Sequence, residues 1–241
     1  MKKSAGFTLI EMSIVLIVIS LILGGVIKTV GVQRQQLKRD ETRQQLTVIT
    51  EALLGFALTN GRLPCPDTGV DGREDFAGGA ALATLIDCDD EEGLLPHVDI
   101  GVGNNDVWGN RFIYRVTGSG IESFADDVPS QVGTPQAAAS SFSIDSTSPN
   151  PAIGNITIND MNGNSIALQV PAVVVSLGEN GGRQMACGAA LSLAEQQNCN
   201  GDTIFIDSFY SNQAGQQFDD LLVWLPLTVL KARMIEAELL P

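Results

Sequence analysis

Histidine is nearly absent from this chain, which has a single copy, His97, in 241 residues. The four cysteines form no C-x-x-C pair, so the ligand spacing of a zinc site is missing. Ser176 has no nucleophile elbow around it, and one histidine is a poor basis for a serine hydrolase. The segment "SLGENGG" lacks the lysine of a phosphate-binding loop and the spacing of a dinucleotide-binding turn. We therefore expect neither an enzyme nor a bound cofactor.

Positive charge is also scarce, because 14 Lys and Arg stand against 28 Asp and Glu, a net charge of −14. A leader that carried away Lys2 and Lys3 would leave the mature chain at −16. Such a chain repels polyanions, which excludes nucleic acid and favours cations or a basic protein surface as partners. The 44% of apolar residues exclude a disordered chain, and the length allows one or two domains.

A long apolar segment lies at the start of the chain. Over residues 7–27 the only ionisable residue is Glu11, and a helix of this length covers roughly the 30 Å of bilayer hydrocarbon. Because Lys2 and Lys3 precede it, the positive-inside rule places the N-terminus in the cytoplasm and the chain after Lys28 across the membrane. A secretory signal peptide is the alternative, although the apolar run exceeds a typical signal core. We predict a single-pass transmembrane helix.

The helical pattern continues beyond this segment. Residues 28–60 contain no proline, and apolar residues recur at spacings of three and four, namely Leu46, Ile49, Leu53 and Phe56. Gly61 and Pro64 would end the helix. The sequence therefore predicts one helix over residues 7–60, about 80 Å long, with a transmembrane half and an amphipathic half.

Residues 61–225 show a different pattern, in which turn residues separate short apolar runs. The runs "RFIYRV", "FSIDS", "NITIND", "SIALQV", "AVVVSLG" and "TIFID" are typical of strands, and residues 118–141 of a loop. The end of the chain predicts a strand followed by a short helix that begins at Pro226, with Leu227, Leu230 and Met234 on one face. We predict an α+β fold in which the long helix packs on a mainly antiparallel sheet, residues 61–241 forming the globular domain.

The four cysteines all lie on the far side of the predicted membrane segment. In an oxidising periplasm they would form disulfides, and four cysteines allow three connectivities. We favour the two local pairs, Cys65 with Cys88 and Cys187 with Cys199, because each closes a loop rich in turn residues.

Acidic residues are concentrated in residues 67–92, where nine carboxylates accompany the single cation Arg73. The default interpretation is a solvated acidic loop. A disulfide between Cys65 and Cys88 would bring two acidic runs together, and calcium, which takes roughly six to eight oxygen ligands, would relieve their repulsion. The candidate ligands of this alternative are Asp67, Asp71, Asp75, Asp89 and Asp90.

Glu11 is the residue of the apolar segment that most needs an explanation. A carboxylate in the hydrocarbon costs about 2.5 to 3.5 kcal/mol, so an acid at this depth usually has a partner and a function. Cleavage between Gly6 and Phe7 would create an amino group four residues before Glu11. In a staggered array this amine would pair with Glu11 of a neighbouring copy. Glu11 is therefore a candidate assembly residue.

The segment "KKSAG" followed by "FTLIEMSIVLIVISLILGG" resembles the class III leader of type IV pilins and type II secretion pseudopilins. The resemblance implies a pilin-like fold. It also implies a prepilin peptidase that removes residues 1–6 in the cytoplasm and methylates the new Phe7 amine. Glu11 falls at the fifth mature position, where this family carries its glutamate.

Further segments support the resemblance. "DVWGNRFIYRV", residues 106–116, is similar to a turn and strand of major pseudopilins, which implies turn and core roles for its aromatic residues. "GRLPCPD", "PAVVVSLGENGG" and "FDDLLVWLP" resemble a longer group of bacterial pilin-like proteins. The long helix lacks the proline found in many relatives, and the soluble part is longer than in typical major subunits, which favours a minor component.

The resemblance and the residues together predict a structural subunit. It would be stored in the inner membrane with its C-terminal domain in the periplasm, and assembled as a minor pseudopilin or minor pilin into a type II secretion pseudopilus or type IV pilus. Its partners would be prepilin peptidase, other pilin subunits and the inner-membrane assembly platform. The competing hypothesis is a membrane-anchored periplasmic binding or adhesion domain that does not polymerise.

Overall fold

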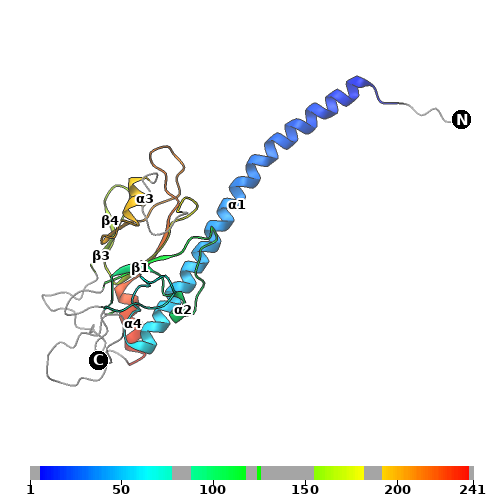
Figure 1. Cartoon of the computed structure of the whole chain (residues 1–241). Helices are drawn as coiled ribbons and strands as arrows, with labels where there is room; N and C mark the ends of the chain where they lie inside the picture. Colours follow the sequence, from blue (N-terminus) through cyan, green and yellow to red (C-terminus); the bar gives the residue numbers. More distant parts are fainter. Residues whose placement is uncertain (1–5, 78–87, 118–123, 126–154, 182–191, 239–241) are drawn as a thin grey trace, which may run out of the picture. The chain divides into compact units, whose positions relative to one another are not determined.

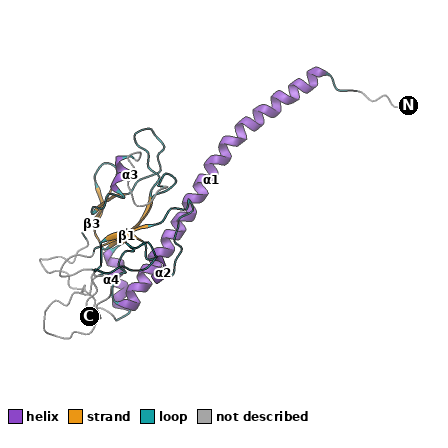
Figure 2. Cartoon of the chain, viewed as in Figure 1, coloured by secondary structure: helices purple, strands orange, loops and turns teal. Residues whose placement is uncertain are grey.

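The computed structural model describes residues 6–77, 88–117, 124–125, 155–181 and 192–238, without the side chains of residues 22–30 and 32 (Figure 1). The chain forms two compact units, Met1–Glu41 and Thr42–Pro241. The fold is α+β, with a long N-terminal helix, a mostly antiparallel sheet domain and a short C-terminal helix (Figure 2).

Helix α1 covers Leu9–Asn60, so it begins two residues later than predicted and ends at the predicted position. Within the unit that starts at Thr42, its buried side chains are spaced by three and four residues: Leu46, Ile49, Leu53 and Ala57. Phe56, expected on this face, is only partly buried. Among the residues that the structure describes, no helix is both long enough and apolar enough to cross a membrane.

A four-stranded antiparallel sheet forms the centre of the globular unit. Its order is β1 (Glu92–Leu94), β2 (Ile113–Val116), β5 (Ala172–Ser176) and β7 (Leu221–Leu225). Side chains of β5 alternate between two cores: Ala172 and Val174 join the core against α1, and Val173 and Val175 join the opposite core. Because both faces of β5 are buried, its sequence is a continuous apolar run rather than an alternating one.

A second sheet covers the face of the first one that is turned away from α1. It has the order β4 (Ser165–Val170), β3 (Ile156–Asn159) and β6 (Ile204–Ile206), and β3 pairs with β6 in parallel. Ile156, Ile158 and Phe205 pack with the β2 and β5 side chains between the sheets. The predicted strands of residues 155–160, 165–170 and 203–207 thus lie in this second sheet, whereas "FSIDS" lies outside the described residues.

Three further helices complete the described part of the chain: α2 (His97–Ile100), α3 (Leu193–Gln197) and α4 (Leu227–Glu236). The last one follows β7 as predicted, with Pro226 as its N-cap. Leu230 and Met234 are fully buried in the core with α1, and Leu227 packs against it. Most of the predicted loop at residues 118–141 lies outside the described residues.

The segment between α1 and β1 is held by a disulfide and a buried ion pair. Cys65 and Cys88, one of the two favoured pairs, are bonded with their Cα atoms 5.3 Å apart. Arg62 donates to Glu74 at 2.6 Å and 3.2 Å, and the Glu74 carboxylate also accepts from the Cys65 N–H. Cys199 is disulfide-bonded too. Its predicted partner, Cys187, lies outside the described residues.

The acidic residues named as alternative calcium ligands are not gathered into one group in the part of the chain that the structure describes. Asp67 is 1% exposed, and its carboxylate accepts hydrogen bonds from the N–H groups of residues 70–72. Asp75 accepts from the N–H groups of Thr68 and Gly69. Among the described residues, no three of the candidate ligands come within metal-binding distance of one another: Asp67, Asp71, Asp75, Asp89 and Asp90. Backbone N–H groups, whose positions cannot be read from the sequence, donate to the Asp67 and Asp75 carboxylates instead.

Candidate functional site

The start of α1 is stabilised by a reciprocal pair of hydrogen bonds. Thr8 precedes the first helical residue, and its hydroxyl accepts from the Glu11 N–H at 3.3 Å. The Glu11 carboxylate in turn accepts from the Thr8 N–H and the Thr8 hydroxyl, both at 2.8 Å. This arrangement is a capping box, which satisfies N–H groups that a helix start leaves without intrahelical partners. The Glu11 carboxylate is thus fixed at the N-terminus of the helix.

The predicted cleavage position lies just outside this cap. Gly6 and Phe7 have non-helical backbone, and the Phe7 side chain is 79% exposed. The Gly6–Phe7 bond thus lies outside the helix, which the capping box begins at Thr8. The T-x-x-E spacing from Thr8 to Glu11 indicates this cap in the sequence, but only Glu11 was predicted to have a role.

Comparison with known families supplies the decisive observation for this segment. The family model of the prokaryotic N-terminal methylation motif matches residues 1–27. The chain carries the N-terminal motif of prepilin-type proteins. No curated protein and no solved structure gives a significant match to the chain.

The prepilin-type motif is the hallmark of type IV pilins and pseudopilins, whose role is structural rather than enzymatic. It contains Gly6, Phe7 and Glu11, the three residues that the sequence analysis singled out. The motif implies processing by prepilin peptidase and association with other pilin subunits. The remaining 214 residues lie beyond it, so the sites of the globular unit depend on the structure alone.

A buried group of three carboxylates lies in the globular unit. Glu195 is on α3, and Asp219 and Asp220 immediately precede β7, with carboxylate oxygens within 4.8 Å of one another. Glu195 closes a capping box with Ser192 and accepts from the side-chain amide of Asn180 at 2.9 Å. The sequence analysis missed this group, although the S-x-x-E spacing at the start of α3 was a readable signal.

Asp219 links this acidic group to the turn that follows β5. Its carboxylate accepts from the N–H groups of Glu179 and Asn180 at 2.8 Å and 3.1 Å. The turn requires a glycine at position 178, where φ is +61° and a Cβ would lie 2.5 Å from the backbone oxygen of Asp219. Burial, together with a side-chain hydrogen bond to Glu195, raises the pKa of Asp219 to about 6. Asp219 therefore binds a proton at a higher pH than an ordinary aspartate does.

Asp219→Asn is expected to stabilise the globular unit at pH 7.5. The pKa of Asp219 in the folded chain, about 6, lies above the ordinary value of 3.8, so folding favours the protonated acid. The free energy of unfolding therefore falls as the pH rises from about 4 to 6, and it stays at the lower value above pH 6. An amide at this position keeps the acceptor for the turn and removes the charge, a gain on the order of 2 kcal/mol. Urea unfolding of the full chain in detergent, followed by Trp108 and Trp224 fluorescence at pH 5 and 7.5, measures it.

Asp160→Asn is the matched control, because the hydrogen bonds that Asn164 and then Asn162 donate to Asp160 lower its pKa. The ionised Asp160 carboxylate stabilises the fold above about pH 4, and this stabilisation is lost at lower pH. Replacing it with an amide therefore gives no gain in the free energy of unfolding at pH 7.5. A wild-type chain more stable than Asp219→Asn at pH 7.5 would contradict the assigned protonation.

One local motif occurs twice in the globular unit. In D-x-x-G-N at residues 106–110 and again at 160–164, the aspartate Oδ1 accepts from the N–H groups two and four residues later. The glycine has a φ of +90° in the first copy and +81° in the second. The first copy is anchored in the core, where the Ser176 hydroxyl donates to Asp106 at 2.6 Å. The second forms the exposed β3–β4 turn and carries Met161 at its tip.

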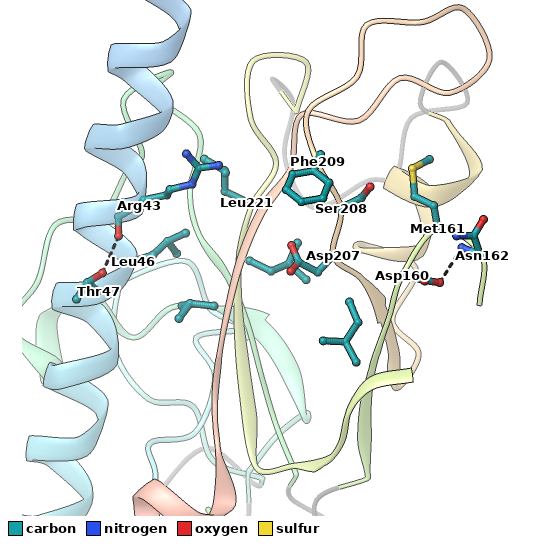
Figure 3. Close-up of a pocket in the computed structure, with 13 residues that line it drawn as sticks. Arg43, Leu46, Thr47, Asp160, Met161, Asn162, Asp207, Ser208, Phe209 and Leu221 are labelled. Carbon is teal, nitrogen blue, oxygen red and sulfur yellow. Dashed lines mark hydrogen bonds between the residues drawn. The ribbon is translucent and has the colours of Figure 1, made fainter. Parts of the chain in front are cut away.

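This second turn borders a groove of about 680 Å³ between α1 and the second sheet (Figure 3). The groove is lined on the helix side by Arg43 and Leu46, and on the other side by the β3–β4 turn and by Asp207 to Phe209. Phe209 is 93% exposed. Burial raises the pKa of Asp207, and its neighbour Ser208 and the Arg43 charge oppose this. The groove thus combines apolar walls with two carboxylates, those of Asp160 and Asp207.

Proposed function

We propose that this chain is a prepilin-like structural subunit, a minor pseudopilin or minor pilin of a type II secretion pseudopilus or type IV pilus. The observation that carries the proposal is the prepilin-type motif matched at residues 1–27, a range that includes Gly6, Phe7 and Glu11. Prepilin peptidase cleaves between Gly6 and Phe7 and methylates the new amine. The length of the globular domain supports a minor rather than a bulk subunit.

Before assembly the subunit is held in the inner membrane. The apolar residues 7–27 form the anchor, and Lys2 and Lys3 keep the N-terminus in the cytoplasm. The C-terminal domain then lies in the periplasm, where its disulfide between Cys65 and Cys88 is chemically stable. The assembly platform and the other subunits are its partners, and the net charge of −14 argues against nucleic acid.

Glu11 changes partner during assembly in this proposal. In the single chain its carboxylate is held by Thr8, which orients it at the helix start. Cleavage creates a positive amine on Phe7, and a staggered neighbouring subunit brings that amine to the carboxylate. Two charges that are each costly in hydrocarbon then form a pair, which favours the assembled state.

The N-terminal residue and the intact mass of the chain from native membranes test this function. In the presence of prepilin peptidase we expect a mature chain that begins with N-methylated Phe7, and without the peptidase a chain that still begins at Met1. An intact Met1 in both membranes would instead support a membrane-anchored binding or adhesion domain. Cleavage beyond residue 27 would indicate a secretory signal.

A further inference from the structure

Strand β7 lies at an open edge of the four-stranded sheet. It pairs with β5 from Leu221 to Leu225, and within the described part of the chain no strand pairs with its other side. The residues of β7 make no backbone hydrogen bond to any other described segment. On the open side, every second residue turns its N–H and C=O away from β5. An edge of this kind is a template for one more strand.

The groove beside α1 runs along this edge. Leu221, Leu222 and Val223 are consecutive in β7, and all three line the groove. Successive side chains of a strand point to opposite faces of the sheet. Accordingly, Leu221 and Val223 pack with the core against α1, and Leu222 packs with the core between the sheets. A wall formed by all three is therefore the edge of the strand and not one of its faces, so the groove gives access to the main chain.

The two sides of the groove suit the alternating side chains of an extended segment. Figure 3 shows Leu221 between Leu46 of α1 and Phe209, which follows β6. A strand added to β7 would point one row of side chains toward α1 and the other row toward the second sheet. On the side of the second sheet, Phe209, Ile166 and Met161 are 93%, 49% and 41% exposed. Large apolar side chains that gather around one groove mark an interaction site.

The charges of the groove favour a basic segment over an acidic one. The carboxyl of Asp207 already has Arg43 as a cationic neighbour that acts on it. Asp160 is the other carboxylate of the groove, and hydrogen bonds donated chiefly by Asn164 lower its pKa, so it is ionised at neutral pH. Residues 42–241 hold eight Lys and Arg against 25 Asp and Glu, so the globular unit as a whole repels an acidic partner.

We propose that an extended segment of a partner protein binds this groove by adding to β7 as a further strand, with an apolar side chain against Phe209 and a lysine or arginine beside Asp160. Main-chain hydrogen bonds to the open edge give the affinity, and the alternating side chains give the selectivity. The occupant is a partner protein rather than a second copy, because two copies of this acidic unit repel each other. The inference goes beyond the subunit function, since a membrane-anchored binding domain would use the same groove.

The probe for this contact is a synthetic peptide of alternating valine and threonine, with a lysine at each end and a fluorophore. We expect its fluorescence polarisation to rise and saturate as the purified full chain in detergent is added, with detergent micelles alone as the baseline. A second peptide carries glutamate in place of both lysines. It should bind about tenfold more weakly, because it brings a negative charge beside Asp160. Equal binding of the two peptides would overturn the basic character of the partner.

Methylation of the peptide amides tests whether the peptide is held as a strand. One form carries N-methyl groups on the valine residues, and the other form carries them on the threonine residues. In a strand paired with β7, the N–H groups of alternate residues point toward β7 and the others point away. We therefore expect one form to bind like the parent peptide and the other to bind about tenfold more weakly. Equal binding of the two methylated forms would overturn strand addition.

Substitutions in the chain locate the site. Phe209→Ala and Asp160→Asn should each weaken binding of the lysine peptide about fivefold, the first through lost apolar contact and the second through the lost charge. Leu193→Ala and Glu236→Gln are the matched controls and should leave the affinity unchanged, because both side chains are exposed and neither lines the groove. Unchanged affinity in both groove variants would overturn the groove as the site.

The remaining outcomes separate the occupants. If no peptide binds to the full chain, the groove is not a strand-binding site. If the full chain is a dimer in detergent that the lysine peptide dissociates, as measured by sedimentation, a second copy occupies the groove and the partner protein is wrong as the occupant. Neither result bears on maturation at Phe7, so the subunit function is decided by its own test.

Discussion

Glu11→Ala is expected to abolish incorporation of the chain into filaments while cleavage after Gly6 continues. The substitution leaves the Phe7 amine of the neighbour without its counter-charge in an apolar environment, at a cost of about 3 kcal/mol per contact. This corresponds to about a hundredfold loss in each subunit addition. The measurement is the amount of the mature chain in sheared or purified filaments relative to that in membranes.

Two matched variants separate the charge of Glu11 from its part in the capping box. Glu11→Gln keeps a side-chain oxygen that accepts from the Thr8 N–H but removes the charge. Thr8→Ala removes the hydroxyl from the box and keeps the charge, with a loss of about 1 kcal/mol in helix capping. If pairing with the amine drives assembly, Glu11→Gln fails like Glu11→Ala, and Thr8→Ala assembles at near wild-type levels.

The opposite pattern would contradict the proposed role. Assembly by Glu11→Gln together with failure of Thr8→Ala would show that the helix start, and not the charge, limits incorporation. The residue would then act through the local geometry of α1.

The elements of the fold that are determined by local sequence were predictable. Helix α1 was predicted because its apolar spacing and lack of proline extend to Gly61, whose position favours a helix end. Strands β2, β3, β4, β5 and β6 lie inside runs predicted from their apolar and β-branched residues. Short elements such as β1 and α3 were missed, because three to five residues carry too little periodicity to be recognised.

The division into two sheets was not predictable from the chain. It depends on β2 pairing with β5 across the intervening β3 and β4, and on β6 joining β3 in parallel.

The hydrogen-bond partners of the carboxylates were not predictable from the sequence either. The high number of acidic residues near Asp67 can be read from the sequence, but the backbone N–H groups that donate to the Asp67 carboxylate cannot. Glu195 and Asp219 are 24 residues apart, yet the Asp219 N–H donates directly to the Glu195 carboxylate in the folded chain.

The disulfide between Cys65 and Cys88 is expected to contribute about 3 kcal/mol to the stability of the globular unit. It closes a segment of 23 residues, and loss of the cross-link frees the unfolded chain to explore more conformations. Cys65→Ala with Cys88→Ala removes the cross-link without leaving a free thiol. Urea unfolding of the full chain in detergent, followed by Trp108 and Trp224 fluorescence, gives the free energy of unfolding and its dependence on urea.

The urea dependence shows in which state the disulfide acts. An effect on the unfolded chain raises the slope of the unfolding free energy against urea, because the uncrosslinked chain exposes more surface. An effect on the folded state lowers the midpoint and leaves the slope unchanged. Cys65 is fully buried, so Cys65→Ser with Cys88→Ser should lose more stability than the alanine pair, since a buried hydroxyl then needs a partner.

The hydrogen bonds around Glu74 limit how far this loss can spread. Its carboxylate binds Arg62 and the Cys65 N–H, and Arg62 also lies over the rings of Phe56 and Phe76, 5.4 Å and 5.9 Å from their centroids. The segment therefore keeps its attachment to α1 when the disulfide is absent. We expect the alanine pair to fold cooperatively with a lower midpoint. A chain that no longer folds would show instead that the disulfide is required to form this segment at all.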